Sequence, residues 1–257
     1  MLDIALAPDE RLDEVNEKLT LIQKKDGLTF GTDAFLLAAF MKQQKYARAA
    51  ELGAGTGIIS LLCASREKFA HIYAIEIQKD FYDIACRNVE YNGYADRVTP
   101  ILGDIRDIRA SSLDGELDVV FANPPFMTVD SGKRNESDRK YIARHEVCGG
   151  IGDFCAAASR LLKHGGKFYC VWRPDRLSSL MAAMNANRLE PKLMTNVHGD
   201  SETPSSMVLV SATKCGAEGM KLLPPLLLHE SGTRADGARP MTARAEKIYE
   251  TMSFEET

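Results

Sequence analysis

Long apolar segments are absent from this 257-residue chain. No run approaches the ~20 residues that a helix needs to cross a bilayer. The N-terminal segment MLDIALAPDERLDEVNEK is acidic, whereas a secretory signal peptide begins with a basic region followed by an apolar one. We therefore expect no membrane association, no signal peptide and a cytoplasmic location.

Closely spaced cysteines or histidines that could bind a metal or form a disulfide framework are also missing. The six cysteines lie far apart without a C-x-x-C pair, most of them in apolar stretches, and the five histidines are equally dispersed. This spacing predicts reduced thiols in the core and no metal site. Basic charge is not in excess either. The net charge of −4 argues against indiscriminate binding to nucleic acid, although it leaves a local basic patch open.

The chain does contain alternating strand-like and helix-like patterns from residue 48 onward. Such alternation predicts an α/β fold with a mostly parallel sheet and helices on both of its faces. The expected strands are residues 48–53, 71–77, 97–104, 117–123, 167–172, 191–198 and 206–213. Helices are expected near residues 56–68, 79–93 and 151–163.

Shorter segments flank this core. Residues 18–23 and 28–30 surround Lys25-Asp26-Gly27 as the strands of a short hairpin would, and residues 32–41 have the pattern of a buried helix. We expect an N-terminal hairpin and helix over residues 1–45 that pack on the core, and a main domain over 46–214. A C-terminal extension over 215–257 carries a helix pattern at 242–252.

A glycine-rich turn follows the first expected strand. In ELGAGTG, Glu51 precedes Gly53, Gly55 and Gly57. Glycines at a strand-to-helix turn permit positive φ and let the backbone approach a ligand closely. The spacing departs from the dinucleotide fingerprint G-x-G-x-x-G because Ile58 stands where the third glycine would be, and the P-loop lysine-serine pair is missing. A glycine turn of some other α/β protein stays open at this point.

Carboxylates end the next two expected strands. Glu76 could accept both hydrogen bonds of a ribose diol, and Asp104 could accept one from an adenine amino group. Ile77 and Ile105 directly follow them and would supply apolar faces for the adenine ring. In a parallel sheet these strand ends share one edge with the glycine turn, and ligands bind at that edge. One such carboxylate alone would be typical of a solvated strand end; the combination points to a ligand.

The fourth expected strand ends in FANPPFM, where two prolines follow an asparagine. Prolines lack an N–H and stop a strand. A planar exocyclic amine has a delocalised, weakly nucleophilic lone pair, and a site activates it by accepting hydrogen bonds from its N–H groups. The carboxamide oxygen of Asn123 and the carbonyl of Pro124 would be the acceptors, Pro125 adds no competing donor, and Phe126 could stack on the ring. We therefore expect Asn123, Pro124 and Phe126 to carry the chemistry.

These motifs resemble those of known enzymes. The acidic residue and the G-x-G-x-G turn are similar to motif I of class I S-adenosylmethionine (SAM) methyltransferases, and NPPF resembles the [N/D]PP[Y/F] signature of those acting on planar amines or amides. GLTFGTDAFLLAAF (27–40) and ARHE (143–146) resemble the "small" methyltransferase-domain proteins, especially the bacterial tRNA1(Val) adenine-N6 methyltransferase family. The matching segments extend from about residue 19 to 213.

The resemblance implies a Rossmann-like class I fold with a seven-stranded sheet and SAM as the cofactor. It places Thr32 and Asp33 near the methionine end of SAM, although the residues alone indicate a helix N-cap. Many relatives carry tyrosine where this chain has Phe126, so a hydroxyl contact is lost there. The expected cofactor-binding set is Thr32, Asp33, Glu51, Gly53, Gly55, Gly57, Glu76, Ile77, Asp104, Ile105 and Asn123.

Basic residues are densest directly after NPPF, and they would contact the phosphates of a nucleic acid. Acidic residues dilute this segment, so a solvated loop is the alternative reading. The expected substrate-binding set is Pro125, Phe126, Lys133, Arg134, Arg139, Lys140 and Arg144.

Several functions stay open at the level of the sequence. The resemblance favours methylation of adenine N6 in RNA, with tRNA as the expected partner. A guanine-N2 rRNA enzyme, a protein-glutamine N5 methyltransferase and a SAM-binding module without catalysis are the alternatives, and the intact NPPF argues against the last. These patterns leave the oligomeric state undetermined.

Overall fold

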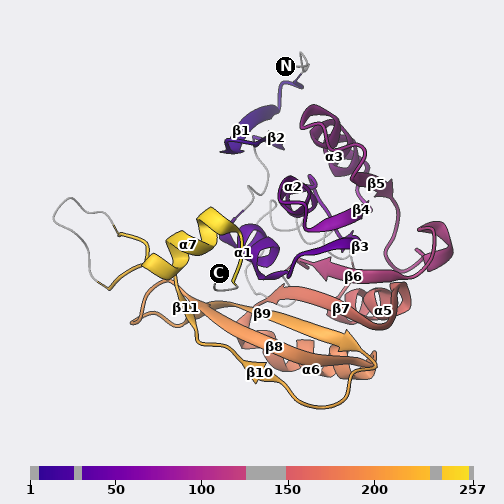
Figure 1. Cartoon of the computed structure of the whole chain (residues 1–257). Coiled ribbons are helices and arrows are strands. Elements are labelled where there is room, and N and C mark those ends of the chain that lie inside the picture. Colours follow the sequence, from indigo (N-terminus) through magenta and orange to yellow (C-terminus); the bar gives the residue numbers. More distant parts are fainter. Residues whose placement is uncertain (1–5, 26–30, 126–148, 232–238, 255–257) are drawn as a thin grey trace, which may run out of the picture.

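The computed structural model describes residues 6–25, 31–125, 149–231 and 239–254. Its centre is a twisted sheet in which seven long strands lie in the order β8-β9-β7-β6-β3-β4-β5 (Figure 1). Neighbouring strands are parallel except at β9, which runs antiparallel to both β7 and β8. The strands are β3 (Gln44–Leu52), β4 (Phe69–Glu76), β5 (Val98–Leu102), β6 (Leu117–Ala122), β7 (Leu162–Trp172), β8 (Leu189–His198) and β9 (Ser205–Lys214).

The predicted α/β fold with a mostly parallel sheet is confirmed. Each of the seven expected strands is present, most of them with bounds shifted by a few residues. Two short strands, β10 (Lys221–Leu222) and β11 (Leu226–Leu227), also pair with β8 at the edge of the sheet. The sequence analysis did not anticipate them, because two-residue strands carry no periodic signal.

Helices cover both faces of the sheet because the central strands are apolar on both sides. Along β6, Val119 and Phe121 join one core and Val120 and Ala122 join the other. The first core includes residues of α1 (Thr32–Phe40), α2 (Ile58–Ser65), α3 (Lys79–Tyr91) and α7 (Ala243–Thr251). The second is formed with α5 (Ile151–Leu161) and α6 (Leu177–Ala186). Helix α6 was missed in the sequence analysis.

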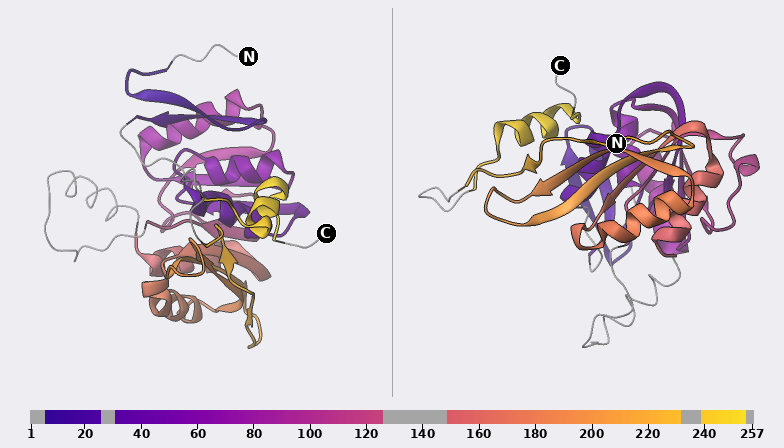
Figure 2. Two further views of the ribbon diagram at one scale, coloured as in Figure 1. Left: turned by 90° about the vertical axis from the view of Figure 1, so that its left-hand side faces the viewer. Right: turned by 90° about the horizontal axis from the view of Figure 1, so that it is seen from below.

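The N-terminal hairpin differs from the expected one. Strand β2 (Leu19–Lys24) pairs antiparallel with the upstream strand β1 (Glu10–Asn16), whereas residues 28–30, the expected partner, lie outside the described residues. The sequence of β1, ERLDEVN, is mostly charged and therefore resembles a solvated segment. Figures 1 and 2 show this hairpin at one end of the molecule, with β8 and β10 at the other.

The C-terminal segment packs on α1. The rings of Phe35 and Tyr249 stack with their centroids 4.3 Å apart, and Phe254 meets Phe40 edge-on. Ile248 is 3% exposed. The hydroxyl of Thr242 caps α7 by accepting a hydrogen bond from the Ala245 N–H at 3.1 Å. The segment expected as an extension therefore covers the helix that begins at Thr32.

Two further findings concern the described residues as a set. None of their helices has the length and apolarity that a bilayer-spanning helix requires. Their five cysteines are all free thiols, and burial raises the pKa of Cys63 to about 12.

We expect Ile248→Ala to destabilise the whole protein, because the removed atoms leave a cavity against the core shared with α1. The loss should be about 2–4 kcal/mol of unfolding free energy, measured by urea denaturation. The exposed neighbour substitution Lys247→Ala is the control and should stay within ~0.5 kcal/mol of the wild type. Equal stability of Ile248→Ala and the control would contradict this packing.

Candidate active site

The glycine turn joins β3 to α2 in a backbone conformation that favours glycine. Gly53, Gly55 and Gly57 have φ values of +71°, +55° and +83°. A residue with a side chain adopts positive φ only at a cost in free energy. The need for positive φ at these three positions explains the spacing of the glycines in the motif. The turn is tied to the next strand, because the N–H groups of Gly53 and Ala54 both donate to the Ile75 carbonyl at 2.9 Å.

Glu76, at the end of β4, lies directly beside the turn. Its Oε2 accepts a hydrogen bond from the Gly55 N–H and its Oε1 accepts one from the Gln78 N–H, both at 2.8 Å. The side chain is 4% exposed, and burial raises its pKa despite these two bonds. Each carboxylate oxygen has two lone pairs, so acceptor capacity is left for ribose hydroxyls. This placement supports the ribose role, which stays a prediction.

Glu51 is buried beneath the turn and faces α2. Its Oε2 accepts hydrogen bonds from the backbone N–H and the hydroxyl of Ser60, at 3.0 and 2.5 Å. Burial raises the pKa of Glu51 to about 8, and the nearby charge of Glu76 adds to this effect. In the described residues, therefore, Glu51 anchors the start of α2, and its predicted contact with the cofactor stays a prediction.

Asp104, after β5, has a partner that the sequence analysis missed. The Nε of Arg106 donates to both carboxylate oxygens at 2.9 Å, and its terminal nitrogen also bonds to Oδ2. This pairing lowers the pKa of Asp104. An adenine amino group would have to share the carboxylate with Arg106. Ile105 is buried and Ile77 half-buried, and their predicted contact with adenine stays a prediction.

Asn123 follows the last residue of β6, and its side chain meets the first turn of α1. Its Nδ2 donates to Oδ2 of Asp33 at 2.8 Å, across 90 positions of sequence. A carboxylate can only accept hydrogen bonds, which fixes the orientation of the amide. The other amide atom, Oδ1, is buried without a partner, and among the described residues it is the one buried side-chain nitrogen or oxygen in this condition.

An unsatisfied buried acceptor costs about 1–3 kcal/mol. This acceptor lies at a strand end beside the glycine turn, where a ligand's donor could satisfy it. The predicted role of Asn123 as an acceptor fits this geometry. Pro124 is buried and Pro125 half-buried. The remaining predicted substrate contacts lie outside the described residues: Phe126, Lys133, Arg134, Arg139, Lys140 and Arg144.

A cleft of about 710 Å³ opens at the start of α1. Asp33 belongs both to this cleft and to the hydrogen bond with Asn123, so it links the cleft to the amide side chain. Arg173 and Asp175 form an ion pair on its wall at 2.7 Å. The cleft is lined by Thr32, Asp33, Arg173, Pro174, Asp175, Pro204, Ser205, Ser206 and Met207.

Sequence reasoning missed the cleft walls formed by the turn after β7 and the loop between β8 and β9. The available signal was that VWRPD ends the fifth expected strand at the same sheet edge as NPPF. Within the described ranges, three His, Cys, Asp or Glu side chains nowhere gather as a metal site would require.

The strand order with one antiparallel strand, the glycine turn after β3 and the acceptor after β6 define the class I methyltransferase fold, and solved structures agree. A protein described as a predicted O-methyltransferase from Agrobacterium tumefaciens matches with a TM-score of 0.67 and 22% identity, over 86% of this chain and 97% of that one. M. jannaschii TYW2, solved with AdoMet, matches with a TM-score of 0.53 and 15% identity, over 82% and 87% of the two chains. These likenesses establish the fold.

The chain belongs to the methyltransferase small domain family, whose model matches residues 24–187. It is a SAM-dependent methyltransferase, and the predicted class, fold and cofactor are confirmed. Two similar proteins carry the name tRNA1(Val) (adenine(37)-N6)-methyltransferase. The one from Phocaeicola vulgatus is 30% identical over 77% of this chain and 84% of its own length. The one from Dyadobacter fermentans is 31% identical over 62% of this chain and 64% of its own length, which is less than two thirds.

We expect the stability of the protein to fall as the pH rises from about 4.5 to about 8, partly through Glu51. The folded state keeps the Glu51 proton up to about pH 8, whereas the unfolded state loses it near 4.5. The stabilisation by protonated Glu51 is thus fully present below the pKa of the unfolded state, and it is lost as the pH rises through the pKa of the folded state. Glu51→Gln cannot ionise and should lose less stability over this range, by an amount on the order of a few kcal/mol.

Urea denaturation of both proteins at about pH 5 and about pH 8.5 measures this difference. Glu90→Gln, at an exposed position of α3, is the matched control and should follow the wild-type pH dependence. If Glu51→Gln has the same pH dependence as that control, the buried carboxyl does not titrate as described.

Proposed function

We propose that this methyltransferase transfers the methyl group of SAM to the exocyclic N6 amine of adenine in RNA, with tRNA as the substrate. The observation that carries the proposal is the buried, unpaired Oδ1 of Asn123 beside the glycine turn. The names of the curated relatives support adenine N6 and tRNA. A tRNA substrate also accords with a cytoplasmic location.

Asn123 performs the central chemical task. When bound, SAM would supply an electrophilic methyl group attached to a sulfonium. The new N–C bond would form as the methyl–sulfur bond breaks to leave a thioether, and the methylated amine would then release one N–H proton to solvent. The lone pair of the amine must be localised for this attack, and a hydrogen bond from its N–H to Oδ1 of Asn123 does so. The Pro124 carbonyl is the proposed second acceptor, because proline presents an oxygen at this position without an N–H. Both acceptors also stabilise the positive charge that develops on the nitrogen.

Asp33 makes Asn123 a better acceptor. Its carboxylate holds Nδ2 at 2.8 Å, which prevents the amide from turning its N–H groups toward the amine. The same hydrogen bond draws electron density through the amide toward Oδ1, as hydrogen bonds in a chain polarise one another. Asp33 is therefore proposed as a positioning residue for Asn123, in addition to its predicted place near the cofactor.

The cleft beside Asp33 supports a nucleotide substrate. It opens beside Asp33, the hydrogen-bond partner of Asn123, so a nucleotide bound in the cleft would lie one residue away from that amide. Arg173 lines the cleft, where its guanidinium is paired with Asp175 at 2.7 Å, so a phosphate would have to share or replace that partner. The phosphate-binding role of the basic residues between 133 and 144 stays a prediction.

The nature of the product tests the proposal directly. The protein is incubated with methyl-labelled SAM and, in separate reactions, total tRNA, total rRNA or a protein extract, followed by mass spectrometry of the digested product. We expect N6-methyladenosine in tRNA. N2-methylguanosine in rRNA or N5-methylglutamine in protein would overturn the assignment of the substrate.

The Asp33–Asn123 pair gives the sharpest prediction about catalysis. We expect Asn123→Ala to slow single-turnover methyl transfer by about 10²–10³, as is typical for the loss of one preorganised electrostatic partner. Binding of S-adenosylhomocysteine, measured by calorimetry, should change far less. If Asn123→Ala transfers the methyl group at the wild-type rate, NPPF only ends the strand and has no catalytic role.

A charge swap is the matched control. Asn123→Asp alone faces the carboxylate of Asp33 at hydrogen-bond distance, so like-charge repulsion should impair it. Combining it with Asp33→Asn restores one donor and one acceptor and should recover activity by at least about tenfold, the equivalent of ~1.4 kcal/mol. A double variant no faster than Asn123→Asp would show that the pair does not act as a unit.

A further inference from the structure

Two asparagines fasten the N-terminal hairpin to α3. Oδ1 of Asn88 accepts a hydrogen bond from the Ile22 N–H at 2.7 Å, and its Nδ2 donates to the Ile22 carbonyl at 3.1 Å. Asn92 makes the same pair with Thr20, at 3.0 and 2.8 Å. Residues four apart on a helix share a face, as do residues two apart on a strand. The two carboxamides therefore match alternate peptide groups along one edge of β2.

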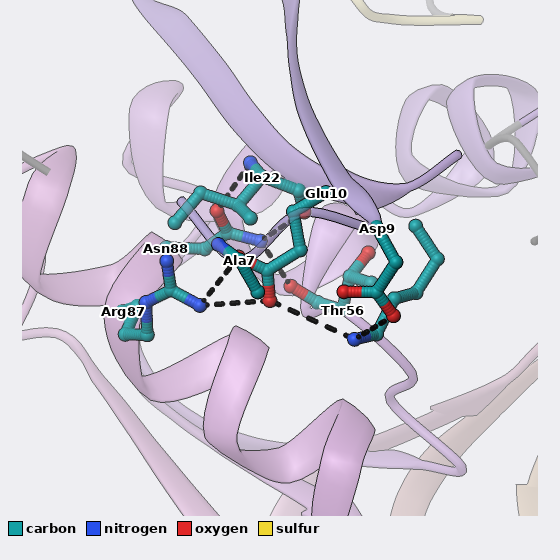
Figure 3. Close-up of polar contacts among 8 residues, drawn as sticks. Ala7, Asp9, Glu10, Ile22, Thr56, Arg87 and Asn88 are labelled. Carbon is teal, nitrogen blue, oxygen red and sulfur yellow. Dashed lines mark hydrogen bonds and ion pairs between the residues drawn. The ribbon is translucent and has the colours of Figure 1, made fainter. Parts of the chain in front are cut away.

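The third hydrogen bond of Asn88 reaches the glycine turn, and that of Asn92 does not. The Nδ2 of Asn88 also donates to the Thr56 carbonyl at 3.0 Å, between the second and third glycines of the turn. Figure 3 shows the carboxamide of Asn88 with Ile22 on one side and Thr56 on the other. The extra hydrogen bond of Asn92 instead stays within α3, at the Asn88 carbonyl, 2.7 Å away. Asn88 is fully buried, so these bonds do not compete with water.

An ion pair holds the same face of the hairpin. Arg87, next to Asn88, contacts the carboxylate of Glu10 at 2.9 Å, and Glu10 also accepts a hydrogen bond from the Ala7 N–H at 2.9 Å (Figure 3). The Glu10 side chain is 4% exposed. The hairpin is thus fixed to α3 at three successive points, and Asn88 connects this assembly to the glycine turn.

We propose that Asn88 is a positioning residue for the cofactor, acting through the Thr56 carbonyl. A turn with three glycines loses more conformational freedom on ligand binding than one already held in place. In this protein the neighbouring Gly55 N–H is held by Glu76 and the Thr56 carbonyl is held by Asn88. Two alternate peptide groups of the turn, 54–55 and 56–57, are therefore oriented before SAM arrives, and the hairpin supplies the support on one side. The proposal depends on SAM binding at this turn but not on the identity of the methyl acceptor.

Asn88→Ala and Asn92→Ala form a matched pair that tests this role. Each removes one double hydrogen bond to β2, so both should lower the melting temperature, Asn88→Ala by more because Asn88 is fully buried and Asn92 half-buried. Only Asn88→Ala releases Thr56. We expect it to raise the Kd for S-adenosylhomocysteine roughly three- to tenfold, the equivalent of one lost hydrogen bond, with Asn92→Ala within about twofold of the wild type. Calorimetry measures both affinities, and the KM for SAM should rise in Asn88→Ala with little change in kcat.

A second variant, with affinities measured at a low temperature where circular dichroism shows each variant folded, keeps the test valid. Asn88→Asp has the same shape and keeps the acceptor for the Ile22 N–H, but it loses the N–H groups that hold Thr56 and sets a carboxyl oxygen against the Ile22 and Thr56 carbonyls. Its Kd should also rise by at least about threefold. Equal affinities of the Asn88 and Asn92 variants would overturn the proposal and leave Asn88 as a purely structural contact. Absence of binding in the wild-type protein would instead contradict the cofactor assignment, so the two failures are distinguishable.

Discussion

The register between β3 and β6 is the constraint on which the rest of the site depends. These two parallel strands are adjacent at the centre of the sheet, and Leu52 lies opposite Ala122. The next residue of each chain segment is therefore Gly53 on one strand and Asn123 on the other, at the same height. A shift of one residue would turn every side chain of a strand to the opposite face. Because both faces of these strands are buried, such a shift would place core residues wrongly, and the packing holds the site in alignment.

Several polar groups at this sheet edge are buried at a cost in free energy that a purely structural region would avoid. Asn123 has an unpaired buried oxygen, and two carboxyl groups, Glu51 and Glu76, have raised pKa values because they are buried. These costs are individually small compared with the burial of apolar residues in the two cores. The packing of the two cores can therefore support these buried polar groups at the edge of the sheet.

Two peripheral segments support the centre from different directions. The N-terminal hairpin reaches the glycine turn through Asn88, which joins β2 to the Thr56 carbonyl. The C-terminal helix α7 packs on α1 through the stacked rings of Phe35 and Tyr249, and α1 carries Asp33. One segment is thus tied to the glycine turn and the other to the helix that carries Asp33. Among the described residues neither segment lines the cleft, whereas Asp33 does.

The sequence by itself determined the local parts of this protein. Apolar runs, glycine spacing and the two prolines act over a few neighbouring residues, so the long strands of the sheet, the glycine turn and the position of Asn123 at a strand end could all be predicted. The tertiary structure decided which polar groups meet. Asp33 and Asn123 are 90 positions apart, and Asn88 lies 66 positions from Ile22. The pairing of β1 with β2 and the cleft walls near Arg173 likewise depend on how elements pack. A side chain's pattern in the sequence shows that it can form a hydrogen bond, but the partner, and with it the orientation of an amide, is set by packing alone.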